Sequence, residues 1–216
     1  MINLYNQDCL PAMKEMPDKA YDLAIVDPPY GVKSKSGDLS GVLTKETKGK
    51  YKLFNDTRPN HDYFEGLFRV SKNQIVWGGN YFHLPTSRGW IYWHKQTPTV
   101  VFADGELAWT SFDRNLRCFD YMWTNVKEGM GRGFKFNKSA NIHPTQKPVR
   151  LYEWLLQNYA KPGNRILDTH CGSGSILIAC DILGFSIDAY EIDADYYQAA
   201  KERLERHQRQ QVLDLK

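Results

Sequence analysis

The stretch Tyr21-Asp22-Leu23-Ala24-Ile25-Val26-Asp27-Pro28-Pro29-Tyr30 predicts a buried parallel strand that ends in a turn with its own chemistry. Residues 21–26 are mostly apolar, as strands covered on both faces are. Two prolines cannot continue the hydrogen-bond ladder, so the chain leaves the sheet after Asp27. Because ligands bind outside the carboxyl ends of strands in open α/β sheets, the turn predicts a binding site.

The side chains of this turn suit a flat ligand with an exocyclic amine. Asp27 and the backbone carbonyls after it are hydrogen-bond acceptors, and Tyr30 offers a ring for stacking. Adenine and cytosine both have these properties. Two prolines alone are common in ordinary turns, but the acid and the ring beside them favour a site.

A second cluster follows a predicted strand at residues 164–168. Cys171-Gly172-Ser173-Gly174-Ser175 leads into an apolar helix at residues 176–180, and glycines at such a turn let the backbone approach a ligand closely. The third glycine of the dinucleotide-binding pattern is missing, since Leu177 stands in its place. The loop alone is therefore a weak signal.

Two acids make the second cluster more specific. The next predicted strand, residues 185–190, ends beside Glu191, and an acid at this point can accept hydrogen bonds from ribose hydroxyls. A pyrophosphate would be repelled by Asp168, whereas a cationic sulfonium would be attracted by it. The pattern favours S-adenosylmethionine over a dinucleotide.

Five segments in this order resemble the amino-methyltransferases of DNA, in the permuted arrangement called the beta group, where the target-base motif precedes the cofactor motif. These segments are Asn6-Gln7-Asp8-Cys9-Leu10, Asp27-Pro28-Pro29-Tyr30, His143-Pro144-Thr145-Gln146-Lys147-Pro148, Asp168-Thr169-His170-Cys171-Gly172-Ser173-Gly174 and Tyr190-Glu191-Ile192-Asp193. The resemblance implies a methyltransferase Rossmann-like fold and associates the chain with restriction-modification systems.

The resemblance also implies roles for individual residues. Catalysis is assigned to Asp27, Pro28, Pro29 and Tyr30. Cofactor binding is assigned to Asp8, Cys9, Asp27, Thr145, Gln146, Lys147, Asp168, His170, Cys171, Gly172, Ser173, Gly174, Glu191, Ile192 and Asp193. Lys147 is expected to neutralise the cofactor's carboxylate. Family members usually carry an aromatic residue where His170 stands, and its protonation state is left open.

Strand and helix signals alternate along the chain, which predicts an α/β fold with a doubly wound, mostly parallel sheet. We expect strands at residues 2–7, 21–26, 74–77, 89–94, 106–109, 119–123, 164–168 and 185–190, and helices at 10–16, 61–70, 148–159, 176–180 and 194–208. The strands at 89–94, 106–109 and 119–123 are expected to form an antiparallel end of the sheet. On the helix at 148–159, Leu151, Trp154, Leu155 and Tyr159 are expected in the core. Trp77 fits either the core or the base pocket.

Charge is unevenly distributed along the chain. Residues 31–60 have seven Lys or Arg against three Asp or Glu, residues 114–150 have eight against two, and the net charge of the whole chain is only +3. Such basic stretches predict a surface for a polyanion, here DNA. The loops at 31–60 and 114–142 are the expected DNA-contacting and target-recognition regions, with contacts from Lys45, Lys48, Lys50, Lys52, Arg132, Lys135 and Lys138.

Length and composition predict one domain, residues 1–216. The four cysteines have neither the spacing of a zinc site nor an extracellular pattern, so we expect reduced thiols, no metal and a cytoplasmic location. The sequence has no signal stretch and no apolar run of membrane length. A homodimer is a further expectation, because members of this group often pair.

These features together predict an S-adenosylmethionine-dependent DNA methyltransferase that acts on the N6 amine of a flipped-out adenine. In the family, an acidic first residue in the Asp27 motif accompanies adenine and serine accompanies cytosine N4. Three alternatives remain open: a cytosine N4 enzyme, an enzyme of the same fold acting on RNA or a protein amide, and an inactive nucleic-acid-binding subunit.

Overall fold

The computed structural model describes residues 1–32, 56–96, 103–122 and 146–214. Within them, eight strands form one sheet in the order β1-β8-β7-β2-β3-β5-β4-β6. The strands are β1 (Ile2–Tyr5), β2 (Tyr21–Val26), β3 (Ser71–Trp77), β4 (Trp90–His94), β5 (Gly105–Thr110), β6 (Arg117–Asp120), β7 (Arg165–Asp168) and β8 (Ser186–Tyr190). The helices are α1 (Cys9–Glu15), α2 (His61–Val70), α3 (Val149–Tyr159), α4 (Ser175–Leu183) and α5 (Ala194–Asp214), with a 3₁₀ turn, η2 (Gly79–Tyr81).

The centre of the sheet is parallel, as the sequence predicts. Strand β2 lies between β7 and β3 and runs parallel to both, with Leu23 opposite Ile166 and Ile25 opposite Ile75. The carboxyl ends of the three strands therefore open at the same edge of the sheet. The predicted doubly wound α/β fold is confirmed.

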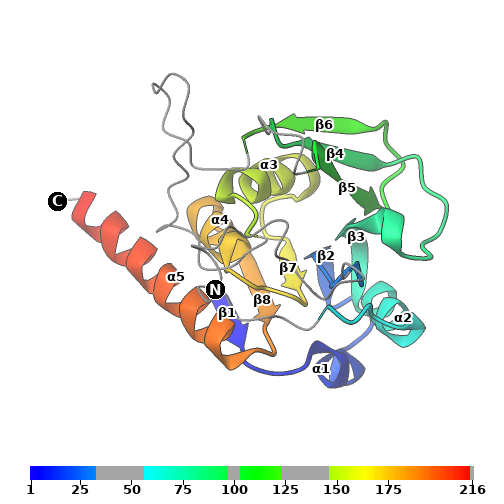
Figure 1. The fold of residues 1–216 in the computed structure, drawn as a ribbon. Helices are drawn as coiled ribbons and strands as arrows, with labels where there is room; N and C mark the ends of the chain where they lie inside the picture. The colour runs from blue at the N-terminus through cyan, green and yellow to red at the C-terminus, as the bar shows by residue number, and fades with distance from the viewer. Residues whose placement is uncertain (33–55, 97–102, 123–145, 215–216) are drawn as a thin grey trace, which may run out of the picture.

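Helices cover both faces of this sheet, with α1 and α2 on one side and α3, α4 and α5 on the other (Figure 1). One core packs α3 and α4 against the sheet, and the other packs α1 and α2 against the opposite face. Leu151, Leu155 and Tyr159 are buried and Trp154 packs against them, as predicted. Trp77 is fully buried in the first core.

The predicted antiparallel end of the sheet is partly wrong. Only β5 runs against its neighbours β3 and β4, whereas β6 lies parallel to β4. The reason is the strand order, because β6 does not continue from β5 as a hairpin but pairs with the far edge of β4, where His94 is opposite Asp120. Strand β6 ends at Asp120, earlier than the predicted residue 123.

Local capping explains where several helices begin and end. The side chain of Asp8 accepts a hydrogen bond from the amide of Leu10 at 2.8 Å, so α1 starts at Cys9. Asn60 caps α2 in the same way, and α2 has the bounds that the sequence predicts. The helix predicted at 176–180 is longer, because it ends only at Gly184, whose φ of 73° is suited to a C-cap.

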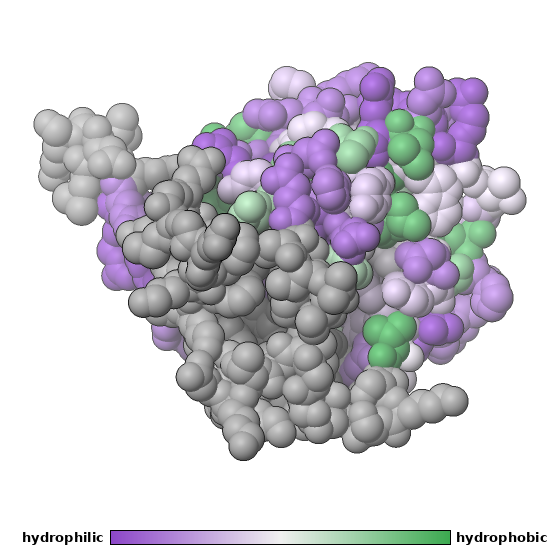
Figure 2. Space-filling model, turned by 45° about the horizontal axis from the view of Figure 1, so that its top comes forward, coloured by the Kyte–Doolittle hydropathy of each residue, from purple (hydrophilic) through white to green (hydrophobic). Residues whose placement is uncertain are grey.

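The described surface is mainly hydrophilic on the face drawn in Figure 2, with hydrophobic residues scattered among polar ones. Among the residues that the structure describes, no helix has both the length and the apolar character needed to cross a membrane. The final helix, α5, extends to Asp214, beyond the predicted end at residue 208.

Candidate active site

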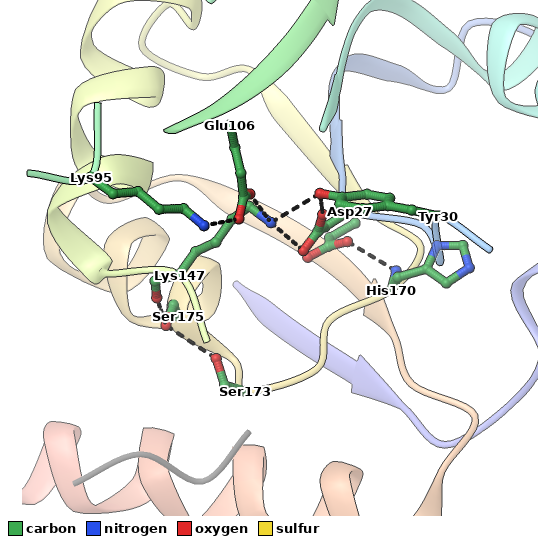
Figure 3. A network of polar contacts seen from close by, with 9 residues as sticks. Asp27, Tyr30, Lys95, Glu106, Lys147, His170, Ser173 and Ser175 are labelled. Atoms are coloured by element: carbon green, nitrogen blue, oxygen red, sulfur yellow. Dashed lines mark hydrogen bonds and ion pairs between the residues drawn. The ribbon is translucent and has the colours of Figure 1, made fainter. Parts of the chain in front are cut away.

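The predicted catalytic acid lies at the carboxyl end of β2 and is held by two donors. Oδ1 of Asp27 accepts a hydrogen bond from the hydroxyl of Tyr30 at 2.5 Å. Oδ2 of Asp27 accepts one from the ammonium of Lys147, and the Asp27 side chain remains 21% exposed (Figure 3). The turn after β2 thus fixes a carboxylate that solvent or a ligand can still reach.

The ring of Tyr30 is packed on several sides. Tyr81 stacks on it with ring centroids 5.1 Å apart, and Phe82 meets it edge-on at 6.2 Å. A Cβ on Gly78 would lie 2.3 Å from the Tyr30 ring, and Gly78 has a φ of +65°. Burial and the nearby Asp27 carboxylate hold the pKa of Tyr30 well above its usual value. Tyr30 is therefore a fixed hydroxyl donor.

Lys147 lies just before α3 and points into the protein, with only 3% of its side chain exposed. Its ammonium pairs with Asp27 and, at 3.2 Å, with Oε2 of Glu106, and it lies 5.3 Å from the centroid of Trp77. Burial alone would lower the pKa of Lys147, but the charges of Asp27 and Glu106 outweigh it, so that the pKa is raised. Lys147 is a buried cation. The predicted pairing with a cofactor carboxylate stays a prediction.

Glu106 and Lys95 extend this network, and sequence reasoning gave neither a role. Oε1 of Glu106, at the start of β5, pairs with the ammonium of Lys95 at 2.5 Å. Burial would raise the pKa of Glu106, but Lys147 and Lys95 together lower it. The only signal in the sequence is an acid at the start of an otherwise apolar strand, Leu107-Ala108-Trp109.

The other predicted acid of the sheet edge, Asp168, ends β7 and is only 2% exposed. It accepts a hydrogen bond from the backbone amide of His170 at 3.0 Å. Burial raises the pKa of Asp168 to about 8, and the charges of Asp27 and Glu191 add to this effect. A cation close to Asp168 would stabilise its charged form.

The glycine loop is tied to Glu191 by its backbone. The amide of Gly172, whose φ is 52°, donates to Oε2 of Glu191 at 2.8 Å, and the amide of Asp193 donates to Oε1 at 2.9 Å. Gly174 serves a different purpose, because a Cβ there would lie 3.0 Å from the Cβ of Ala200 in α5. The first glycine thus shapes the loop, and the second lets α4 and α5 pack closely.

The open question about His170 has a physical answer. Its ring meets the ring of Tyr63 from α2 edge-on, with centroids 5.4 Å apart, and its Nδ1 lies 3.0 Å from the hydroxyl of Thr169. Burial lowers the pKa of His170 to about 4. His170 is therefore neutral near pH 7 and packs as an aromatic ring against α2.

The serines of the loop connect it to the segment that carries Lys147. The hydroxyl of Ser175 donates to the backbone carbonyl of Lys147 at 2.7 Å and lies 3.2 Å from the hydroxyl of Ser173 (Figure 3). Arg203 from α5 donates to the Ser175 hydroxyl at 2.9 Å and to the Ser173 carbonyl at 2.8 Å. The glycine loop and the Asp27 site are thereby parts of one bonded network.

The remaining predicted site residues have different surroundings. Asp8 is exposed and caps α1, and Cys9 is buried behind it, with a pKa raised by burial to about 12. Ile192 is 68% exposed, and Oδ1 of Asp193 accepts a hydrogen bond from the amide of Asp195 at 2.9 Å at the start of α5. Pro28 and Cys171 are buried, and Pro29 and Gln146 are partly buried.

Several predicted residues lie outside the described ranges. They are Thr145 and the expected DNA contacts Lys45, Lys48, Lys50, Lys52, Arg132, Lys135 and Lys138. Their roles stay predictions, as do those of most of the loops at 31–60 and 114–142.

The charges at this edge of the sheet suit S-adenosylmethionine. The carboxylates of Asp27 and Glu191 both act on Asp168, and the one cation among the described groups that also acts on it is Lys147, which already pairs with Asp27 and Glu106. A pyrophosphate would add negative charge beside a buried acid, whereas a sulfonium would add a compensating positive charge. The acidic side chains at this edge of the sheet therefore fit the predicted cofactor.

Comparison with known proteins agrees with this chemistry. Residues 109–202 match a family described as DNA methylase. The chain is 26% identical to the type II methyltransferase M.HpaI of Haemophilus parainfluenzae, over 92% of this chain and 72% of the relative. It is 24% identical to the type II methyltransferase M2.DpnII of Streptococcus pneumoniae, over 94% and 89% of the two chains.

Solved structures show the same fold. The crystal structure of the M1.HpyAVI complex with S-adenosylmethionine has a TM-score of 0.55 and 20% identity, and the match covers 94% of this chain and 100% of the other. PvuII DNA methyltransferase, described as cytosine-N4-specific, has a TM-score of 0.57 and 14% identity over 93% and 85% of the two chains.

The matched family region contains Lys147, the glycine loop and Glu191, and the Asp27 turn lies beside them at the same edge of the sheet. The predicted family and cofactor are confirmed, whereas the target base is left undecided between adenine and cytosine. The chain is thus similar to the DNA amino-methyltransferases, the N6/N4 family that uses S-adenosylmethionine to methylate DNA.

Proposed function

We propose that this enzyme methylates the N6 amine of adenine in a base flipped out of the DNA duplex. The observation that carries the proposal is the position of Asp27, whose carboxylate lies beside the glycine-loop network and is not fully buried. An acid at this position accompanies adenine in the family that the sequence resembles, which is why adenine is preferred over cytosine.

Asp27 has enough acceptor capacity to hold an amine. Two carboxylate oxygens offer about four lone-pair sites, and Tyr30 and Lys147 use one site on each oxygen. The remaining sites can accept the amine hydrogens of adenine. That contact opposes delocalisation of the nitrogen lone pair into the ring and makes the nitrogen a better nucleophile.

The chemistry needs no covalent enzyme intermediate. S-adenosylmethionine supplies a methyl group on a sulfonium, and the amine nitrogen forms a bond to that methyl as the carbon–sulfur bond breaks. The nitrogen then carries an extra proton, which passes to Asp27 or to water. The residues of the chain thus orient the amine and hold its protons.

A base in a duplex cannot align with the cofactor, so it must leave the stack at a cost of a few kcal/mol. Stacking on an aromatic side chain offsets about 1 to 3 kcal/mol of this. Tyr30 and Tyr81 form a stacked pair beside Asp27, and Tyr81 is 38% exposed. We assign this pair to the base pocket.

We assign cofactor contacts to the other side of the site. Glu191 would accept hydrogen bonds from the ribose hydroxyls, since each of its oxygens has a lone pair beyond the one used by the loop amides. Asp168 would face the positive part of the cofactor, and the exposed Ile192 would pack on the purine. Glu191 therefore has two roles, shaping the loop and binding the ribose.

Nucleoside mass spectrometry tests the proposed target. Genomic DNA without amino-methylation is incubated with the enzyme and S-adenosylmethionine and then digested to nucleosides. We expect N6-methyladenine, formed by the wild type and not in a reaction without cofactor. The second candidate, cytosine N4, is favoured by the structural likeness to PvuII methyltransferase. N4-methylcytosine as the product would overturn the adenine assignment, and no methylated base would overturn the proposed function.

A further inference from the structure

A row of alternating charges runs from the proposed catalytic acid into the antiparallel part of the sheet. Asp27 pairs with Lys147, Lys147 pairs with Glu106 at 3.2 Å, and Glu106 pairs with Lys95 at 2.5 Å (Figure 3). The four side chains come from the end of β2, the segment before α3, the start of β5 and the residue after β4. Ion pairs between these side chains thus connect segments that are distant in the sequence.

The two lysines are the most buried members of this row. The side chain of Lys147 is 3% exposed and that of Lys95 is 10% exposed, whereas those of Asp27 and Glu106 are each slightly above 20%. A buried ammonium needs anions around it, because burial without them is strongly unfavourable. Lys147 has two anions in contact, on opposite sides, and the position of its ammonium depends on both.

We propose that Glu106 is a positioning residue for methyl transfer, which holds the ammonium of Lys147 so that Asp27 keeps lone pairs free for the target amine. The proposal rests on the proposed function, because it assumes that Asp27 binds the amine. Among the described ion pairs, Glu106 contacts Lys147 and Lys95, so we assign it an effect on Asp27 through Lys147 and no contact with the base or the cofactor.

Asp27 and Glu106 compete for one ammonium, that of Lys147. With Glu106 in place, Lys147 divides its three N–H donors between two carboxylates and lies 3.4 Å from the Tyr30 hydroxyl. Without the Glu106 charge, Asp27 is the one remaining anion among its described contacts. The ammonium already contacts Asp27, so the N–H that Glu106 held turns to the Asp27 carboxylate and occupies acceptor sites that the amine needs. Misplacement of the amine that results from this competition can lower the rate by up to about 100-fold.

The first test replaces Glu106 by glutamine, which keeps the shape and removes the charge. For Glu106→Gln we expect kcat to fall by about 10- to 100-fold, while calorimetry shows cofactor affinity within about 2-fold of the wild type. The matched control is Glu153→Gln in α3, where a glutamate with an 11% exposed side chain pairs with Arg150 at 2.8 Å. This control should keep wild-type kcat.

A pH profile separates positioning from a general structural effect. The charged and titratable groups around Lys147 come from every neighbouring element and are Asp27, Tyr30, Lys95, Glu106, Tyr152 and Asp168. Removing the Glu106 charge takes away one of the two anions that raise the pKa of Lys147. We therefore expect the high-pH limb of the kcat profile to move to lower pH in Glu106→Gln.

A double variant keeps the test informative if Glu106→Gln does not fold, since that change removes the ion pair between Lys95 and Glu106. Lys95→Gln with Glu106→Gln removes one charge of each sign, and we expect the same loss of kcat and the same shift in the pH profile. Wild-type kcat and pH profile in either folded variant would overturn the inference. Failure of the wild type itself to methylate DNA would instead overturn the proposed function.

Discussion

Replacing Asp27 by asparagine is expected to lower the turnover of DNA methylation by at least about 100-fold, with little change in cofactor affinity. Asparagine keeps the shape of the side chain but loses its charge and presents amide hydrogens in place of one acceptor. Asp27 acts mainly when the amine becomes nucleophilic, so the loss should appear in kcat. Transfer of tritiated methyl groups to DNA measures turnover, and calorimetry measures cofactor binding.

Asp22→Asn is the matched control for this experiment. Asp22 lies near the start of β2, the strand that Asp27 directly follows. Its side chain is 28% exposed against 21% for Asp27, and it pairs with Lys72 at 2.7 Å. It should keep turnover near that of the wild type. Near wild-type turnover in folded Asp27→Asn would remove Asp27 from the mechanism.

Replacing Gly78 by alanine is expected to lower the turnover of DNA methylation by about 10- to 100-fold. The new Cβ would lie 2.3 Å from the ring of Tyr30, so the ring must move and its 2.5 Å hydrogen bond to Asp27 must break or lengthen. Misplacement by about 1 Å is enough for a loss of this size. Gly78→Ala should also melt at a lower temperature, because alanine at a φ of +65° adds backbone strain.

Gly184→Ala separates the backbone strain from the displaced ring. Gly184 has a φ of +73°, close to that of Gly78, but a Cβ there meets no atom within 4 Å. This variant should be destabilised by about 1 to 2 kcal/mol and should keep its turnover. Equal turnover in the two variants would show that the position of Tyr30 does not matter for catalysis.

Features determined by short stretches of sequence were predicted well. The bounds of β2 are those predicted because the strand is a continuous apolar run that Pro28 and Pro29 end. The glycine loop lies between β7 and α4 as expected, since its turn depends on local backbone freedom at Gly172. Both clusters meet at one edge because parallel strands carry their carboxyl ends to the same side.

Features that depend on distant contacts were not predictable in the same way. Strand β6 pairs with the edge strand β4, and no local sequence pattern specifies which edge of the sheet it joins. The inward position of Lys147 depends on Glu106, which lies 41 positions earlier in the sequence and reaches the site only because β5 inserts between β3 and β4. A lysine beside a predicted cofactor site was therefore assigned to the cofactor, whereas in the structure it contacts two carboxylates.

The distance between the target amine and Asp27 is the measurement closest to the central claim. It can be obtained from a crystal structure of the enzyme with S-adenosylhomocysteine and DNA that contains the methylated sequence. The account predicts an extrahelical adenine whose N6 lies within about 3.2 Å of a carboxylate oxygen of Asp27, with Glu191 at hydrogen-bonding distance from the cofactor ribose. A target base whose amine lies away from Asp27, with the cofactor bound elsewhere, would contradict it.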